Sequence, residues 1–149
     1  SKHDSKLHIA LAKKLLEHKA TFEKMKIILH DKLSGHAYDE VYKNIRAVLV
    51  PSVAPEALPY VVSEACLRGR VIIASRIGGI PEQVKGLEGV RLVESGNVDE
   101  LSEMIEEVLS MDWEEVVELG MRNRRGILRK FDNIRIINKL IRLFEKVMD

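Results

Sequence analysis

The sequence predicts an α/β domain of three layers, in which a parallel sheet is covered by helices on both faces. Short, continuous apolar runs are typical of strands that are buried on both sides. Segments with apolar residues at helical spacing separate these runs, as in a sheet built from strand–helix–strand units. The 149 residues are 46% hydrophobic and 32% charged, which suits one globular domain with a sizeable core.

The expected elements alternate along the whole chain. The strands are expected at residues 25–30, 47–50, 71–74 and 90–93. The helices are expected at residues 7–23, 34–44, 59–68, from 97 onward, from 112 onward and at 133–148. Right-handed crossovers should connect the strands. No repeat, low-complexity segment or linker interrupts the pattern, so residues 1–149 are interpreted as a single domain.

Capping signatures fix several helix boundaries. Asn97 with Glu100 has the capping-box spacing, in which the first side chain bonds the backbone three residues later. Asp112 repeats the signature with Glu115. The helix over 34–44 is expected to place Tyr38, Val41 and Ile45 on its apolar face.

Composition excludes several classes of function. A net charge of +1 gives no global field for nucleic acid, so no nucleic-acid partner is expected. The one cysteine, Cys66, lies in an apolar run and is interpreted as a buried, inert thiol in a reducing, cytoplasmic compartment. The five histidines have no metal-ligand spacing, and no metal is expected. A single Gln and a single Thr beside abundant Lys, Glu, Ile and Val are typical of proteins from hot environments.

The loop over 51–59 is the most informative candidate site. It follows a strand and opens a helix, at the sheet edge where α/β folds bind ligands. With Pro59 as first helical residue, the helix would direct its free N–H groups and dipole toward a phosphate. Glu56 precedes this start, and Glu64 lies roughly 7–8 Å beyond it along the helix. Carboxylates at these places can accept hydrogen bonds from the vicinal hydroxyls of a ribose and a hexose.

A second loop, SRIGGIPEQV, follows the strand at 71–74. Gly78 and Gly79 allow close backbone approach to a ligand, and Pro81 then begins a short helical turn. A Gly-Gly pair alone is more often a turn than a ligand loop. Its place after a strand and near the first loop favours the functional interpretation.

These motifs, in this order, resemble the C-terminal domain of the family-four retaining glycosyltransferases. The resemblance rests on Pro51-Ser52, the spacing of Glu56 and Glu64, the EA pair at 64–65, Gly69 before VIIAS, and GGIPE at 78–82. It runs from about residue 26 to 109, and Phe131-Asp132 looks like the late aromatic motif of the family.

The resemblance implies one Rossmann-like lobe of a two-lobed GT-B enzyme that binds a nucleoside-diphosphate sugar. It implies that Glu56 touches the donor sugar beside the reaction centre and that Glu64 binds the ribose hydroxyls. The backbone of Ala57, Leu58 and Pro59 would hold the diphosphate, with Ser52, Gly78 and Gly79 completing the donor site. The implied transfer retains anomeric configuration and needs no metal or further cofactor. The acceptor would be held by a missing N-terminal lobe, and a lipid-linked acceptor would bring peripheral membrane contact.

The chain departs from the family pattern in three places. Ala57-Leu58-Pro59 stands where the family has glycine-phenylalanine-glycine, and Pro59 supplies no N–H. The basic Arg and Lys of the family have no secure match, Lys2 and Lys6 being at most remnants. One strand precedes the one at 47–50, where the family has three. Two alternatives follow: a fragment that begins after the first strand of the lobe, or a reduced lobe.

Less specific interpretations stand beside these. Glu56 and Glu64 would, without their context, be solvated surface charges. Tyr60 is expected to pack at the helix start rather than stack on a base. The basic residues at 122–130 are interpreted as a solvated helix face rather than a lipid or phosphate site. At the level of function, an enzyme lobe for glycosyl transfer is the leading hypothesis, and a non-catalytic nucleotide-binding or protein-interaction module of the same fold is the alternative.

Overall fold

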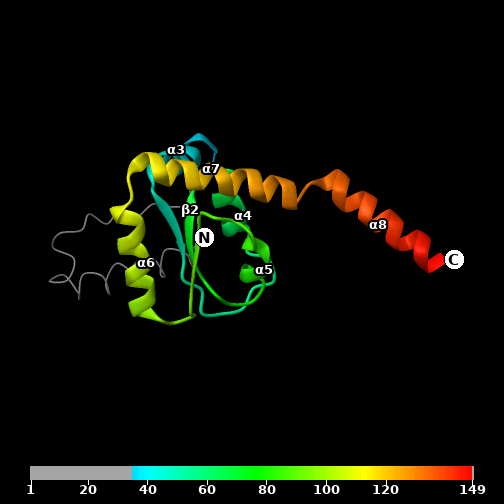
Figure 1. The fold of residues 1–149 in the computed structure, drawn as a ribbon, viewed down its shortest axis with the longest axis horizontal. Helices are drawn as coiled ribbons and strands as arrows, with labels where there is room; N and C mark the ends of the chain where they lie inside the picture. Colours follow the sequence, from blue (N-terminus) through cyan, green and yellow to red (C-terminus); the bar gives the residue numbers. More distant parts are fainter. Residues whose placement is uncertain (1–34, 149) are drawn as a thin grey trace, which may run out of the picture. The chain divides into compact units, whose positions relative to one another are not determined.

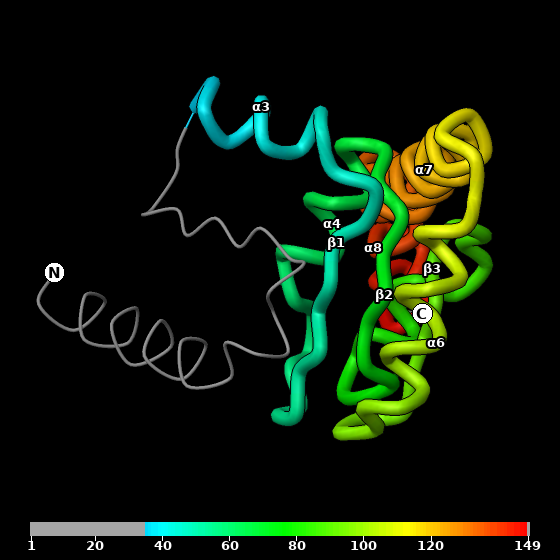
Figure 2. Tube along the Cα trace, turned by 90° about the vertical axis from the view of Figure 1, so that its left-hand side faces the viewer, coloured from blue at the N-terminus to red at the C-terminus, as the bar shows by residue number. Residues whose placement is uncertain are grey.

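Three parallel strands form the sheet in the computed structural model, which describes residues 35–148 (Figure 1). They are β1 (Ala47–Val50), β2 (Val71–Ser75) and β3 (Val90–Val93). Their order is β1-β2-β3, with Ala47 opposite Val71 and Ile72 opposite Val90. Figure 2 shows β1 at one edge, with β2 between it and β3. The predicted parallel sheet is confirmed for these strands. The predicted helix at 7–23 and strand at 25–30 lie outside the described residues.

Six helices accompany the sheet in the described part of the chain. They are α3 (Gly35–Asn44), α4 (Tyr60–Leu67), α5 (Ile80–Val84), α6 (Val98–Ser110), α7 (Trp113–Lys130) and α8 (Asn133–Met148). Figure 1 shows α4 and α5 on one side of the sheet and α6 on the other. This is the three-layer α/β arrangement that the sequence predicts.

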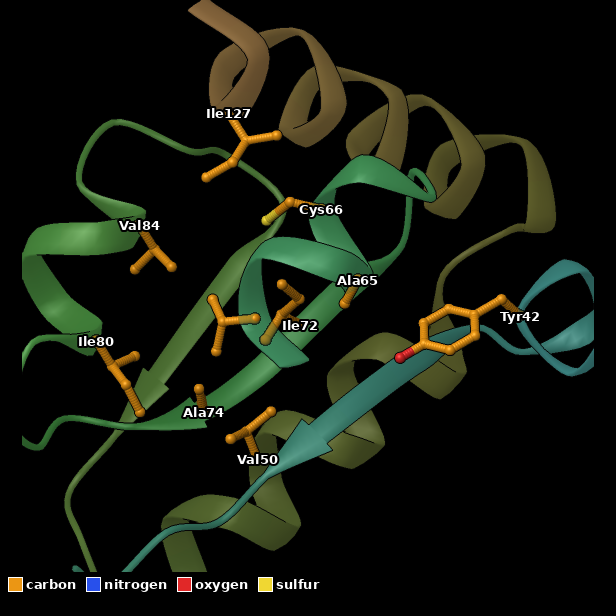
Figure 3. Packing of buried hydrophobic residues seen from close by; sticks show 10 residues of the cluster. Tyr42, Val50, Ala65, Cys66, Ile72, Ala74, Ile80, Val84 and Ile127 are labelled. Atoms are coloured by element: carbon orange, nitrogen blue, oxygen red, sulfur yellow. The ribbon is translucent and has the colours of Figure 1, made fainter. Parts of the chain in front are cut away.

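Alternation along β2 divides the core between the two faces. Ile72 and Ala74 pack with residues of α3, α4 and α5, whereas Val71 and Ile73 pack with residues of α6 and α7. All five residues of β2 are buried, as the continuous apolar run predicts for a central parallel strand. Figure 3 shows the first cluster, in which side chains from α3, α4, α5 and α7 converge on Ile72 and Ala74.

Helix α3 buries one residue, Tyr42, that the sequence prediction omitted. Tyr42 is its buried side chain, while Tyr38 and Ile45 are partly buried and pack against the same cluster. The helical spacing from Tyr38 to Tyr42 is four residues, so both tyrosines lie on one face. The prediction is confirmed for Tyr38 and Ile45, which pack against the core, and it missed Tyr42, because aromatic side chains with a polar tip also serve as core residues.

The ends of α4 and α7 are joined by small residues and one buried amide. Gly69, at φ +66°, ends α4, and its N–H and that of Arg70 bond back to Cys66 and Ala65, as in a Schellman motif. A Cβ on Gly120 of α7 would lie 2.0 Å from the Gly69 carbonyl oxygen, so this crossing requires glycine.

Asn123, fully buried on α7, connects the beginnings of β2 and β3. Its Oδ1 accepts from the Gly89 N–H at 2.9 Å, and its Nδ2 donates to the Gly89 and Arg70 carbonyls at 2.9 and 3.0 Å. The amide oxygen and both N–H groups of the amide nitrogen are therefore engaged with backbone at the amino ends of the strands. The sequence gives no sign of this role, because the partners lie 34 and 53 residues away.

The predicted caps differ in outcome. The Asn97 side chain accepts from the Glu100 N–H at 3.1 Å, which confirms the cap of α6. The Glu100 carboxylate accepts from the Glu94 N–H at 2.7 Å. Asp112 is the N-cap residue of α7, but its side chain makes no capping hydrogen bond, so the second capping box is wrong.

Helix α8 buries none of its residues. Its apolar side chains are exposed, among them Ile134, Ile137, Ile141, Phe144 and Met148. These residues form the apolar stripe that the sequence predicts. Figure 1 shows α8 continuing from the end of α7 and leading away from the sheet. No helix in the described part of the chain is both long and apolar enough to span a membrane.

Candidate functional site

The loop after β1 is exposed at the carboxyl edge of the sheet. Residues 53–58 are all exposed, whereas Pro59 is buried. Ser52 anchors the loop at its base, because its N–H donates to the Val50 carbonyl at 2.9 Å and its own carbonyl accepts from Ser95 Oγ at 3.1 Å. Ser52 therefore links the loop after β1 to the loop after β3.

Helix α4 begins one residue later than the sequence predicts. Pro59 is its N-cap residue, with extended backbone angles of φ −66° and ψ 121°, and Tyr60 is its first helical residue. Proline fixes φ near this value, which is compatible with either position. Among residues 35–148, no side chain caps α4, so none of them competes with a ligand for the N–H groups of the first turn.

Tyr60 contradicts its expected packing role. Its side chain is 81% exposed at the first position of α4. The aromatic ring therefore stands free beside the uncapped helix start.

Glu64 lies in the middle of α4 and is partly buried. Its Oε2 accepts a hydrogen bond of 2.8 Å from the Tyr38 hydroxyl on α3. The Tyr38 and Tyr42 hydroxyl oxygens are 3.2 Å apart. Hydrogen bonding to Tyr42, followed by burial and hydrogen bonding to Glu64, raises the pKa of Tyr38 well above its ordinary value. Tyr38 thus remains a protonated donor to Glu64 across the physiological range.

Glu56 is exposed, and its backbone rather than its side chain is held. The Gly79 N–H donates to the Glu56 carbonyl at 2.8 Å. A Cβ on Gly78 would lie 2.4 Å from the Glu56 carbonyl oxygen, and one on Gly79 would lie 1.8 Å from the Ala57 carbonyl oxygen. Both contacts are with backbone, so no side-chain movement could relieve them. The glycine pair therefore brings the two predicted loops together, and its close approach is to the chain itself.

Gln83 on α5 connects the glycine loop to α4, and the sequence reasoning gave it no role. Its side chain is 2% exposed, and Nε2 donates to the Pro59 carbonyl at 3.2 Å and to Ser63 Oγ at 2.7 Å. Gln83 Oε1 is buried, and no residue in the described part of the chain donates a hydrogen bond to it. The signal that was available is its place directly after GGIPE, as the one glutamine of the chain.

A second group missed by the sequence reasoning surrounds Tyr38. The Arg68 guanidinium lies 4.8 Å from the centre of the Tyr38 ring and 4.9 Å from that of Tyr42, within range of a cation–π interaction. Arg68 Nε donates to Asp39 Oδ1 at 3.1 Å. The cluster formed by Asp39, Arg68, Tyr38 and Tyr42 thus joins the end of α4 to α3.

A small cavity of about 180 Å³ also opens at the carboxyl edge of the sheet. Pro51, Val53, Ser75, Val93 and Asn97 are among its lining residues. Neither Glu56 nor Glu64 lines it. Its volume is below the range of about 300–1,000 Å³ that is common for small-molecule sites, so it is too small to hold a nucleotide sugar by itself.

Cys66 and the basic residues of α7 occupy the places expected of them. Cys66 is fully buried in the core, and burial raises the pKa of its thiol to about 12. Arg122 is exposed and pairs with Glu88 at 2.5 Å and with Glu118 at 2.6 Å. In the described residues, no three His, Cys, Asp or Glu side chains are grouped so that they could hold a metal ion.

Comparison with known proteins identifies related sequences. The family model described as "Glycosyl transferases group 1" matches residues 7–126. Trehalose synthase of Rubrobacter xylanophilus is 30% identical over 107 residues, which cover 72% of this chain and 25% of that enzyme. The chain therefore spans about a quarter of the length of this relative.

Solved structures share the fold. Sucrose-phosphate synthase from Thermosynechococcus elongatus superimposes with a TM-score of 0.69 at 23% identity, over 93% of this chain and 35% of that one. Anabaena Alr3699/HepE in complex with UDP-glucose gives a TM-score of 0.69 at 19% identity, over 91% and 36% of the two chains. The same Anabaena protein in complex with UDP gives 0.61 at 22% identity, over 72% and 29%.

The fold, the order of the motifs and the family match agree. The sheet and its helices form the arrangement of one lobe of the GT-B structures. The match covers well over half of the residues and includes the whole stretch from β1 to residue 126, near the end of α7. The chain belongs to the group 1 glycosyl transferases, the family-four enzymes that its motifs resemble.

Proposed function

We propose that this chain supplies the donor-binding lobe for retaining glycosyl transfer from a nucleoside-diphosphate sugar to an acceptor. One observation carries the proposal: Glu56 and Glu64 stand on either side of an uncapped helix start at the carboxyl edge of a parallel sheet. This edge is where α/β folds bind nucleotides. Membership of the glycosyltransferase family supports the same assignment.

The donor would lie along the beginning of α4. The N–H groups of its first turn and its positive dipole end favour a diphosphate, although Pro59 provides no N–H. The backbone around Ala57 and Leu58 would complete the phosphate site. Glu64 would accept hydrogen bonds from the ribose hydroxyls through the part of its carboxylate that Tyr38 leaves free.

Glu56 would bind the sugar next to the reacting carbon. Its exposed carboxylate can accept hydrogen bonds from sugar hydroxyls and stabilise positive charge that develops on the ring. As the sugar leaves, negative charge grows on the diphosphate, and the dipole of α4 opposes that charge. Ser52, Gly78 and Gly79 hold the loop that carries Glu56. The proposed transfer retains anomeric configuration and requires no metal.

Uridine nucleotides are the first ligands to test. The Anabaena protein whose structure resembles this chain was crystallised with UDP and with UDP-glucose. The exposed ring of Tyr60, beside the helix start, offers an aromatic face to a base or a sugar.

The acceptor would be held by a second lobe. The exposed apolar stripe of α8, which has no partner among the described residues, provides a surface that such a lobe could cover. An acceptor linked to a lipid would bring the assembled enzyme to a membrane surface from a cytoplasmic location.

A non-catalytic nucleotide-binding or interaction module is the second candidate. The proline at position 59 favours it, because proline provides no N–H for a diphosphate. Calorimetric titration of the chain with UDP, GDP, ADP and their glucose derivatives tests the proposal. Binding of at least one nucleotide sugar in preference to its nucleotide supports a donor lobe. Absence of binding to all of them contradicts it and leaves the interaction module.

A further inference from the structure

Glu64 is held by a side chain from another helix. The Tyr38 hydroxyl of α3 donates to Glu64 Oε2 at 2.8 Å, although the two residues are 26 positions apart. Glu64 is partly buried. The hydrogen bond from Tyr38 further restricts the rotation of its carboxylate. The hydrogen bond holds Glu64 Oε2 next to α3.

Tyr38 is itself held by two neighbouring side chains, Tyr42 and Arg68. Its ring lies 4.9 Å from the ring of Tyr42 in an edge-to-face arrangement, and its hydroxyl oxygen is 3.2 Å from that of Tyr42. The Arg68 guanidinium covers its ring, and Asp39 in turn holds Arg68. A phenol fixed in this way loses little further entropy when it orients its neighbour.

The two hydroxyl groups have assigned directions. The Tyr38 hydroxyl is the donor to Glu64 Oε2, so the proton of Tyr38 points toward Glu64. The Tyr42 hydroxyl then donates to the Tyr38 oxygen.

We infer that Tyr38 is a positioning residue for Glu64, and that it sets the preference of the site for a nucleotide with free ribose hydroxyls. This inference rests on the proposed function, in which Glu64 binds those hydroxyls. Tyr38 acts through Glu64 alone, so its hydroxyl matters only to ligands that have a hydroxyl for Glu64 to bind.

The test compares two probes, UDP and 2′,3′-dideoxy-UDP, on the 149-residue chain. The measured quantity is the ratio of their dissociation constants, determined by calorimetry. Glu64→Gln should reduce the preference for UDP. Tyr38→Phe removes one oxygen atom and should reduce the same preference by about three- to tenfold, as expected from misdirecting a hydrogen bond to a charged group. Affinity for the dideoxy probe and the unfolding midpoint should stay as in the wild type.

Two further variants make the result specific. Tyr42→Phe also removes a phenol hydroxyl from the cluster, but the Tyr42 hydroxyl bonds Tyr38 and not Glu64. This variant should therefore change the ratio of dissociation constants by less than about twofold. Adding Tyr38→Phe to Glu64→Gln should have no additional effect on the ratio, because the two residues act as a unit.

Three results would overturn the inference. If Glu64→Gln lowers the preference and Tyr38→Phe does not, Glu64 binds the ribose without help from Tyr38, and the proposed function stands. If Tyr38→Phe weakens both probes equally, its role is structural. If Glu64→Gln leaves the ratio unchanged, the ribose assignment of the proposed function fails together with the inference.

Discussion

The Gly79 N–H donates a hydrogen bond of 2.8 Å to the carbonyl oxygen of Glu56. This contact joins two loops that follow neighbouring parallel strands and that the sequence identifies as separate motifs. It holds the backbone of the Glu56 loop against the glycine loop. The glycine pair and the first carboxylate are thus parts of one structure rather than two independent ligand contacts.

Gly79→Ala should therefore displace the Glu56 loop. A Cβ at this position would lie 1.8 Å from the Ala57 carbonyl oxygen, so the backbones must separate. We expect a loss of about 1–3 kcal/mol in the free energy of unfolding, which is typical of overpacking, together with weaker UDP-glucose binding. Urea denaturation and calorimetry measure the two effects. Gly86→Ala is the control, since a Cβ there meets open space; it should affect stability alone, through its φ of +82°. Unchanged stability and binding in Gly79→Ala would contradict this account of the loops.

Asn123→Ala should destabilise the fold without touching the site. It leaves the Gly89 N–H and the carbonyls of Gly89 and Arg70 without their partner in a buried place. Unsatisfied buried groups cost about 1–3 kcal/mol each, and we expect a total loss of about 2–4 kcal/mol after relaxation. Chemical denaturation measures it. The neighbouring exposed Arg124 provides the control, because Arg124→Ala should change stability by less than about 0.5 kcal/mol. A loss below about 1 kcal/mol in Asn123→Ala would show that this amide is dispensable.

The sequence predicts the sheet because each strand is a local apolar run that is independent of its partners. The loops after β1 and β2 were also predictable, since their residues follow strands directly. Tyr38, Arg68 and Gln83 were not, because each acts through a residue 20 or more positions away. The capping hydrogen bond predicted for Asp112 does not form for a related reason. The spacing permits it, but the side-chain rotamer depends on surroundings that the spacing does not describe.

Cys66 should make stability depend on pH at alkaline values. Its pKa in the folded protein is raised to about 12 by burial, whereas an unfolded cysteine titrates near its ordinary value of about 8.5. As the pH rises, the unfolded state loses the thiol proton first. The contribution of Cys66 to the free energy of unfolding is therefore intact below pH ~8.5 and is lost as the pH rises toward 12. The slope should approach ~1.4 kcal/mol per pH unit from this group. Comparing the pH dependence of urea denaturation in the wild type and in Cys66→Ala isolates it from other titrating groups. Equal slopes in the two proteins would contradict the burial of the thiol.

The 149-residue chain alone should not transfer sugar. In the proposed two-lobed enzyme the acceptor is held by the other lobe, and orienting the two reactants can supply as much as ~7–11 kcal/mol of barrier reduction. The exposed apolar stripe of α8 is consistent with a surface that the other lobe would cover. An assay with several nucleotide sugars and with lipid and glycan acceptors measures transfer. Robust turnover without an added lobe would show that the view of this chain as half of an active site is wrong.

The central claim is that Glu56 and Glu64 divide the donor between them, and one set of titrations tests it. UDP and UDP-glucose are titrated into the wild-type chain, Glu64→Ala and Glu56→Ala, with unfolding midpoints measured in parallel. The account predicts that Glu64→Ala weakens both ligands by about 1.5–3 kcal/mol, the contribution of a charged hydrogen bond, whereas Glu56→Ala weakens UDP-glucose alone. If the wild type binds a ligand and both variants bind it with unchanged affinity, the assignment of this site is contradicted.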